Sequence, residues 1–105
     1  MKIEDMPMVR LTWLDAQDSD GSWTDIEDII AHKPCPCQEV GWLVHKDNNK
    51  VIVMRSRIVT EDDNVKEGGG HIAIPASWVI KIEELQINEE NNISIFTPYS
   101  SKNRS

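Results

Sequence analysis

Short apolar runs interrupted by polar residues occupy most of the first 85 positions. In the first run Val9, Leu11 and Trp13 alternate with Arg10 and Thr12, which is the period of two expected of a half-buried β-strand. Similar runs rich in Val, Ile and Trp follow further along the chain. The pattern predicts strands at 9–14, 40–45, 51–58, 72–74 and 78–82.

The segments between these runs predict one helix, one hairpin and one loop. Thr24 and Glu27 have the spacing of a capping box, and the isoleucines that follow give one apolar stripe, so a helix is predicted over 25–31. The Asn-rich spacer 46–49 predicts a hairpin turn. The charged, glycine-ended stretch 60–70 predicts a loop.

Five strands with apolar residues on both faces favour a closed sheet, because an open one would leave one apolar face in water. The predicted fold is therefore mainly β: a small five-stranded SH3-like or Sm-like barrel with one short helix after the first strand. Residues 1–85 form this domain. Residues 86–105 form a polar extension, in which 93–96 is a candidate edge strand.

Composition narrows the class of protein without selecting a function. Hydrophobic residues make up 39% and charged residues 28% of the 105 positions, which is typical of a globular domain. The 18 acidic residues outnumber the 11 basic ones, so the net charge of -7 opposes direct binding to nucleic acid. No apolar run approaches membrane-spanning length, and the start of the chain is too acidic for a signal peptide. A soluble intracellular protein is expected.

Two sets of residues resemble metal ligands. Residues 16–27 place Asp18, Asp20 and Glu27 at the ligand positions of a twelve-residue calcium loop, but Ala16 stands where the first carboxylate belongs. A solvated acidic loop before a helix explains the same residues. We therefore expect no calcium site.

A zinc site is the second metal candidate, with ligands drawn from the cysteines and histidines. The single residue between the two cysteines does not match the usual spacing of zinc ligands, so we expect free thiols and no metal. The candidate ligands are His32, Cys35, Cys37 and His45.

The sequence contains no catalytic signature. The histidines at 32, 45 and 71 and the scattered serines lack a motif such as Gly-x-Ser-x-Gly. The paired acids lie in segments that look solvated, where nothing would raise a carboxyl pKa. A protein without enzymatic activity and without a cofactor is expected.

A candidate anion site combines two arginines with a glycine run. Arg55 and Arg57 lie two apart on one predicted strand, so they share a face. Gly68, Gly69 and Gly70 end the predicted loop and His71 follows them, and successive glycines can turn several backbone N–H groups toward an anion. If the loop folds over the arginines, these donors converge on a phosphate or carboxylate. A flexible loop beside two solvated arginines is the alternative.

Four tryptophans in 105 residues suggest either core packing or binding. Trp42 and Trp78 lie inside strand patterns and are expected in the core. Trp13 and Trp23 flank the acidic loop and are expected to be partly exposed, where a tryptophan can anchor a partner or stack on a base.

Three apolar motifs together resemble a group of small tailed-phage proteins. They are Val9-x-Leu11-x-Trp13-x-Asp15-Ala16, Val40-Gly41-Trp42-Leu43-Val44 and Ile74-Pro75-x-x-Trp78-Val79-x-x-Ile82-x-x-Leu85. The group is mostly of unknown function, so the resemblance implies a phage origin and a bacterial host cytoplasm but no catalytic residue.

Three functions remain open at this point. The first is an oligomeric, non-catalytic phage module that engages a protein partner, whether another copy, a virion protein or a host protein. The second is a counter-defence protein that sequesters a host nucleotide signal through Arg55, Arg57 and the glycines. The third is an acidic nucleic-acid mimic that inhibits a host protein, since residues 15–28 carry six acids and no base. A basic pocket, an acidic stripe or an exposed apolar patch would distinguish them.

Overall fold

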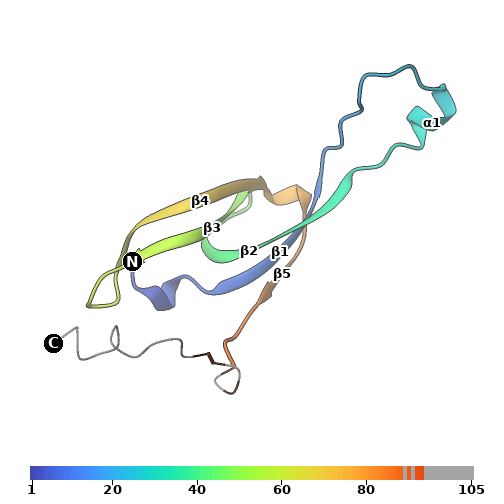
Figure 1. Ribbon diagram of the computed structural model, residues 1–105. Coiled ribbons are helices and arrows are strands. Elements are labelled where there is room, and N and C mark those ends of the chain that lie inside the picture. Colours follow the sequence, from blue (N-terminus) through green and yellow to red (C-terminus); the bar gives the residue numbers. More distant parts are fainter. Residues whose placement is uncertain (89, 91, 94–105) are drawn as a thin grey trace.

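The computed structural model describes residues 1–88, 90 and 92–93. Most of the ordered segments are strands, which confirms the mainly β prediction (Figure 1). In chain order the elements are η1 (Ile3–Asp5), β1 (Met8–Asp15), α1 (Ile26–Ile30), β2 (Cys35–Lys46), β3 (Lys50–Val59), β4 (Val65–Pro75), η2 (Ala76–Trp78) and β5 (Val79–Glu84), where η marks a 3-10 turn.

The five strands form one antiparallel sheet in the order β4-β3-β2-β1-β5. β4 and β5 are the two edges, and no pairing joins them within the described residues. The predicted closed barrel is therefore wrong: the sheet is open.

The open sheet is nevertheless strongly curled, because its two edge strands follow one another in the chain. Strands about 4.8 Å apart would place the edges of a flat five-stranded sheet about 19 Å apart. The link from Pro75 to Val79 spans at most about 14 Å when fully extended. The edges therefore approach each other at this end of the sheet (Figure 1).

The core lies on the concave side of this curl. Leu11 and Val53 are fully buried there, and partly buried side chains from both edges, including Ile72 and Val79, pack against them. The buried members are Val9, Leu11, Trp13, Val51, Val53 and Ile74. Strands at both edges thus share one core without a closed ladder.

A second, smaller cluster explains why both sheet faces carry apolar residues. Met6, Met54 and Val65 are buried, with Ile3 and Trp42 against them. The N-terminal segment is held over this cluster by backbone bonds: the N–H of Ile3 donates to Asp63 O at 3.0 Å, and that of Val65 to Met1 O at 2.7 Å. The covering is supplied by the N-terminus, so barrel closure is not needed.

Several predicted boundaries shift. The strand predicted at 72–74 is part of the longer β4, so the loop predicted at 60–70 is confined to the residues between Val59 and Val65. β2 begins at Cys35 and not at Val40. The candidate edge strand 93–96 lies mostly outside the described residues, and Ile93 itself is not in a strand.

The helix is shorter than predicted and is not buried. α1 has five residues, begins after Asp25 and has no side-chain cap, so the capping box of Thr24 and Glu27 does not form. Instead, the Thr24 hydroxyl donates to Ser22 O at 3.4 Å.

Candidate functional site

A long hairpin arm leaves the sheet between β1 and β2. Leu14 pairs with Pro36 and Asp15 with Cys35, beyond the last β1–β5 pair at Trp13. We call residues 14–36 the arm and residues 16–34, which include α1, its tip. Figure 1 shows the arm projecting from the body, and the molecule measures 66 × 32 × 24 Å.

The tip exposes large apolar side chains. Every residue from 16 to 36 is exposed. The Trp23 side chain is fully exposed, and Ile26, Ile29 and Ile30 of α1 are 69%, 52% and 78% exposed. The apolar side chains of this short helix and loop therefore form a hydrophobic surface that is exposed to solvent.

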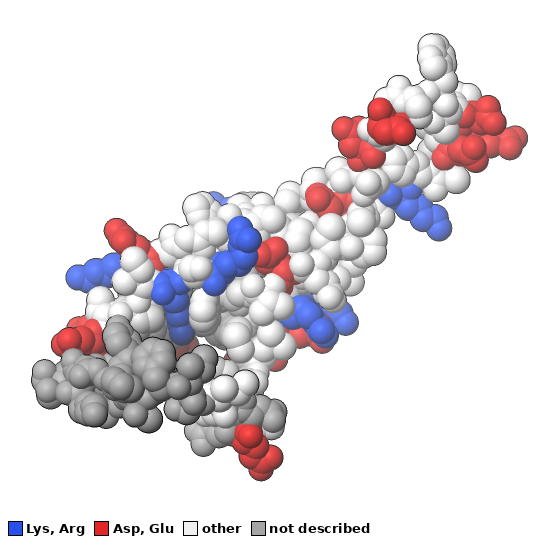
Figure 2. Space-filling view, viewed as in Figure 1, with Lys and Arg blue, Asp and Glu red and all other residues white. Residues whose placement is uncertain are grey.

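The same tip is acidic. Five acids surround the apolar side chains, and Lys33 is the one basic residue of the segment besides His32. Figure 2 shows acidic side chains gathered around the end of the arm. The acids are Asp18, Asp20, Asp25, Glu27 and Asp28.

Local hydrogen bonds order the loop before α1. Asp20 Oδ1 accepts from the Ser22 hydroxyl at 2.6 Å and from the Ser22 N–H at 3.0 Å. These bonds lower the pKa of Asp20, with the hydroxyl contributing most. Gly21 adopts a φ of 84°, which favours glycine. The residues that resemble a calcium loop thus form a turn, and within the described residues no three His, Cys, Asp or Glu side chains group as metal ligands.

The two arginines predicted to form an anion site are engaged with different partners. Arg55 Nε donates to Gly70 O at 3.4 Å and lies 3.5 Å from a Glu39 oxygen. Arg57 Nη1 donates to Ile3 O at 3.2 Å, and its guanidinium group lies 4.4 Å from the centre of the Trp42 ring. Each guanidinium group is held by its own contacts, so the two arginines do not form one cluster of donors for an anion.

The glycine run forms part of a strand and not a loop. In β4, Gly68 pairs with Arg57 and Gly69 with Ser56, while exposed His71 pairs with Met54. Their backbone groups therefore take part in an edge strand and do not form a nest over the arginines.

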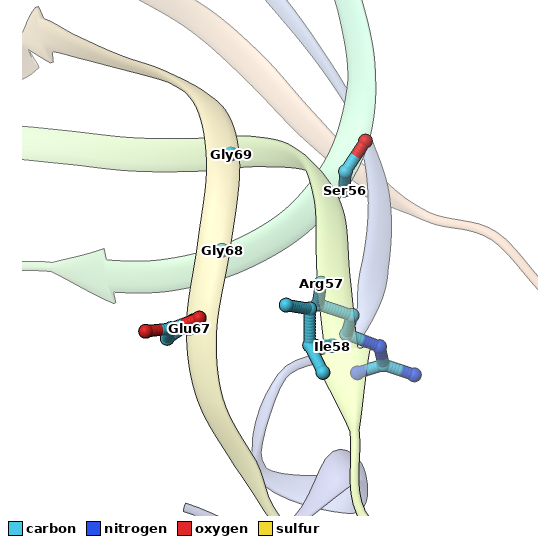
Figure 3. A pocket seen from close by; sticks show the side chains of 6 residues that line it. All are labelled: Ser56, Arg57, Ile58, Glu67, Gly68 and Gly69. Carbon is cyan, nitrogen blue, oxygen red and sulfur yellow. The ribbon is translucent and has the colours of Figure 1, made fainter.

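A small hollow lies where these glycines face β3. It has a volume of about 280 Å³ and is largely apolar; we call it the β3–β4 hollow (Figure 3). Figure 3 shows the Arg57 side chain leading away from Gly68 and Gly69. The lining residues are Ser56, Arg57, Ile58, Glu67, Gly68 and Gly69.

The tryptophans occupy four different environments. Trp13, predicted to be partly exposed, is 6% exposed and belongs to the core. Trp78, predicted to be in the core, is 42% exposed. Trp42 lies under Arg57, and Trp23 is exposed as predicted. Of the predicted site residues, Trp13 is thus unavailable to a ligand, and Trp23 lies on the arm, away from the hollow.

The candidate zinc ligands are dispersed. Cys35 and Cys37 are free thiols at the base of the arm, and burial together with Cys35 raises the pKa of Cys37. His45 lies at the other end of β2 and contacts Asp47 at 2.7 Å. This contact, together with the backbone N–H groups of Lys50 and Asn49, lowers the pKa of Asp47 to about 2.

Sequence reasoning missed the three isoleucines of the tip. Their helical spacing predicts the helix but was not considered as a possible binding surface. The available signal was the setting: the stripe lies in a segment with five acids and no neighbouring apolar run that could cover it.

The chain matches no protein-family model, no curated protein and no solved structure. No helix among the described residues is long and apolar enough to cross a membrane.

Proposed function

We propose that the protein is a non-catalytic binding module that engages a protein partner through the tip of its arm. The observation that carries this proposal is the fully exposed Trp23 beside three exposed isoleucines at the end of a projecting hairpin. Exposed apolar clusters of this kind are typical of interaction sites.

The spacing of the apolar side chains supports a protein partner. Ile26, Ile29 and Ile30 follow the i, i+3, i+4 pattern of a helix that lays one face into an apolar groove. Trp23 adds a large anchor of the type enriched at interface hot spots. α1 is too short to be stable alone, so docking would also stabilise the helix.

The two alternatives have less support. A nucleotide binder needs converging donors, whereas Arg55 and Arg57 are engaged by separate groups of the chain itself. An acidic mimic needs a continuous acidic stripe, whereas the acids of the tip are interleaved with exposed apolar side chains.

We extend the proposal to the fold and the setting. The final strand lies beside the first and follows a 3-10 turn, which supports an SH3-like relationship for this open sheet. The resemblance to small tailed-phage proteins supports a partner in the phage particle or in the cytoplasm of its bacterial host.

Photocrosslinking tests the proposed function. A photoreactive amino acid at position 30, in bacterial cells that produce the protein, should form a discrete crosslinked product. Trp23→Ser should abolish that product, because it removes the anchor. Ile80→Ser, at an exposed residue of the sheet, is the matched control and should leave the product unchanged. A product that survives Trp23→Ser, or no product at all, contradicts the proposal.

A further inference from the structure

We propose that Cys35 and Cys37 are a redox-active dithiol, which a small-molecule disulfide of the glutathione type converts into an internal disulfide. The two residues lie at the start of β2, where the arm joins the sheet, and both are free thiols at rest. Their chemistry does not depend on what the tip binds. The pair is therefore a covalent modification site separate from the binding surface of the tip.

The two thiols lie close together on the same strand. Residues two apart on a strand point to the same face, so both side chains leave β2 in one direction. Cys37 Sγ donates to Cys35 O at 3.6 Å, and Cys35 Sγ donates to Pro36 O at 3.7 Å. Both thiol groups are thus turned toward the two peptide groups that separate them.

The two thiols differ in accessibility, which sets the order of the reaction. Cys35 is exposed, whereas Cys37 is half-buried, pairs with Trp13 on β1 and packs against the core. Burial, and then the neighbouring Cys35, raises the pKa of the Cys37 thiol. Cys35 is therefore the thiol that a disulfide in solution reaches first, and Cys37 is the one that closes the bridge.

The reaction consists of two successive thiol–disulfide exchanges. The Cys35 thiol loses its proton, and the thiolate attacks one sulfur of glutathione disulfide, whose S–S bond breaks and releases one glutathione thiolate. The Cys37 thiol then loses its proton, and its thiolate attacks the Cys35 sulfur and releases the second glutathione. Each released thiolate takes up a proton. The protein dithiol is oxidised by two electrons, and one glutathione disulfide is reduced to two glutathione thiols.

Strain makes the bridge easy to reduce again. Cα atoms two residues apart on a strand are about 6.6–6.8 Å apart, which is the upper limit for a disulfide, where about 5.5–6 Å is usual. Closure must therefore draw Cys35 and Cys37 together and tilt Pro36, which faces Leu14. β3 does not oppose this movement, because its pairing with β2 begins only at Trp42. Strained or exposed disulfides are the labile ones.

Glutathione provides the test, because it is both the oxidant and a mass label. The reduced wild-type chain, incubated with glutathione disulfide, should lose both free thiols and the mass of two hydrogens and should retain no glutathione. Cys35→Ser and Cys37→Ser should each retain one glutathione, because no second thiol displaces it, and Cys37→Ser should acquire it faster. A large excess of reduced glutathione should restore both thiols of the wild-type chain. Intact-mass spectrometry and maleimide labelling measure these changes.

Circular dichroism establishes that each variant is folded, and Cys37→Ala is a second variant that places no hydroxyl group in the half-buried site. Four outcomes overturn the inference. They are wild-type thiols that persist in glutathione disulfide, a wild-type chain that retains glutathione on either cysteine, disulfide-linked dimers in place of the internal bridge, and a bridge that resists a large excess of reduced glutathione.

Discussion

Two glycines lie where the sheet has no room for a side chain or where the backbone takes a positive φ. A Cβ at Gly41 would lie 2.8 Å from Val53 Cγ1 and closer still to the backbone oxygen of Met54. Gly70 has a φ of 64°, and Arg55 beside it has no partner in the ladder between Met54 and Ser56. Arg55 and Arg57 are held by different acceptors, Gly70 O and Ile3 O, so the two residues do not converge although they lie two apart.

The first prediction concerns Gly41. Gly41→Ala should lower the free energy of unfolding by about 1–3 kcal/mol, because the added methyl group meets backbone that cannot move aside. Gly69→Ala is the matched control: its Cβ meets nothing within 4 Å, so the change should be neutral or raise stability by about 0.4–1 kcal/mol. Urea denaturation measures both, and equal effects would contradict the close approach at Gly41.

A second prediction concerns the Asp47 carboxylate in the β2–β3 turn. It contacts a ring nitrogen of His45 at 2.7 Å and accepts the N–H groups of Asn49 and Lys50 at 2.7 and 2.8 Å. The His45 contact, then these N–H groups, lower its pKa from 3.8 to about 2. The contribution to stability is therefore complete above the ordinary pKa and is lost as the pH falls through about 2.

The test of this prediction is Asp47→Asn, which keeps an acceptor oxygen but cannot ionise. The wild-type chain should melt at a higher temperature than the variant near neutral pH. The difference should shrink as the pH falls from about 4 to about 2, followed by circular dichroism. A difference that stays constant down to pH 2 would contradict the role of the charge.

At the scale of elements, the arm and the sheet are nearly independent. All residues from 16 to 36 are exposed, and both buried clusters lie outside this range. Asp15 and Cys35 are directly paired at the base. The sheet thus carries the stability of the fold, and the arm carries the surface proposed to bind.

A third prediction follows for a chain in which residues 16–34 are replaced by Asn-Gly. This dipeptide suits a two-residue turn between paired strands and so can join Asp15 to Cys35. The free energy of unfolding in urea should be unchanged or higher by up to about 2 kcal/mol, because a shorter loop costs less entropy to close. Loss of cooperative unfolding would show that the arm supports the core.

The sequence predicts those elements whose local pattern agrees with their final surroundings. Alternation at 9–14 marks β1 because one of its faces is buried in the core. Residues 65–71 look like a loop because they are charged and glycine-rich, yet they pair along β3 as an edge strand. The start of β2 is hidden in the same way, since Pro36 is tolerated where only one neighbouring strand is present.

For the candidate site, sequence reasoning identified Trp23 but not its neighbours. The apolar period of α1 predicts a helix with one apolar face but not what covers that face, so the isoleucines served only to predict the helix. Trp13 and Trp23 both flank the acidic loop in the sequence, but Trp13 lies on β1 and its side chain belongs to the core. The arginines were placed together because residues two apart on a regular strand share a face, whereas the β3–β4 ladder has no pair at Arg55 and each arginine has its own acceptor.

At the scale of the whole molecule, one connection sets the shape. The short η2 turn joins the two edges of the sheet, so the curl is required by chain length and not by edge-to-edge pairing. The sequence pattern indicates apolar residues on both faces of the sheet, and a closed barrel was predicted because it would bury both faces. The N-terminal segment covers the second cluster instead, and this long-range arrangement has no local signal.

The place of β1 in the sheet also determines at what point during synthesis the core can be completed. β1 is flanked by β2 and β5, and its pairing joins Val9 to Glu84, near opposite ends of the described chain. The β2–β3 and β3–β4 hairpins involve neighbours and close small loops, whereas the β1–β5 pairing closes a loop of most of the chain. On a ribosome, β1 must therefore wait with Leu11 uncovered by β5 until the last strand has emerged. We expect the antiparallel strands β2, β3 and β4 to pair early in folding and β5 to complete the core last.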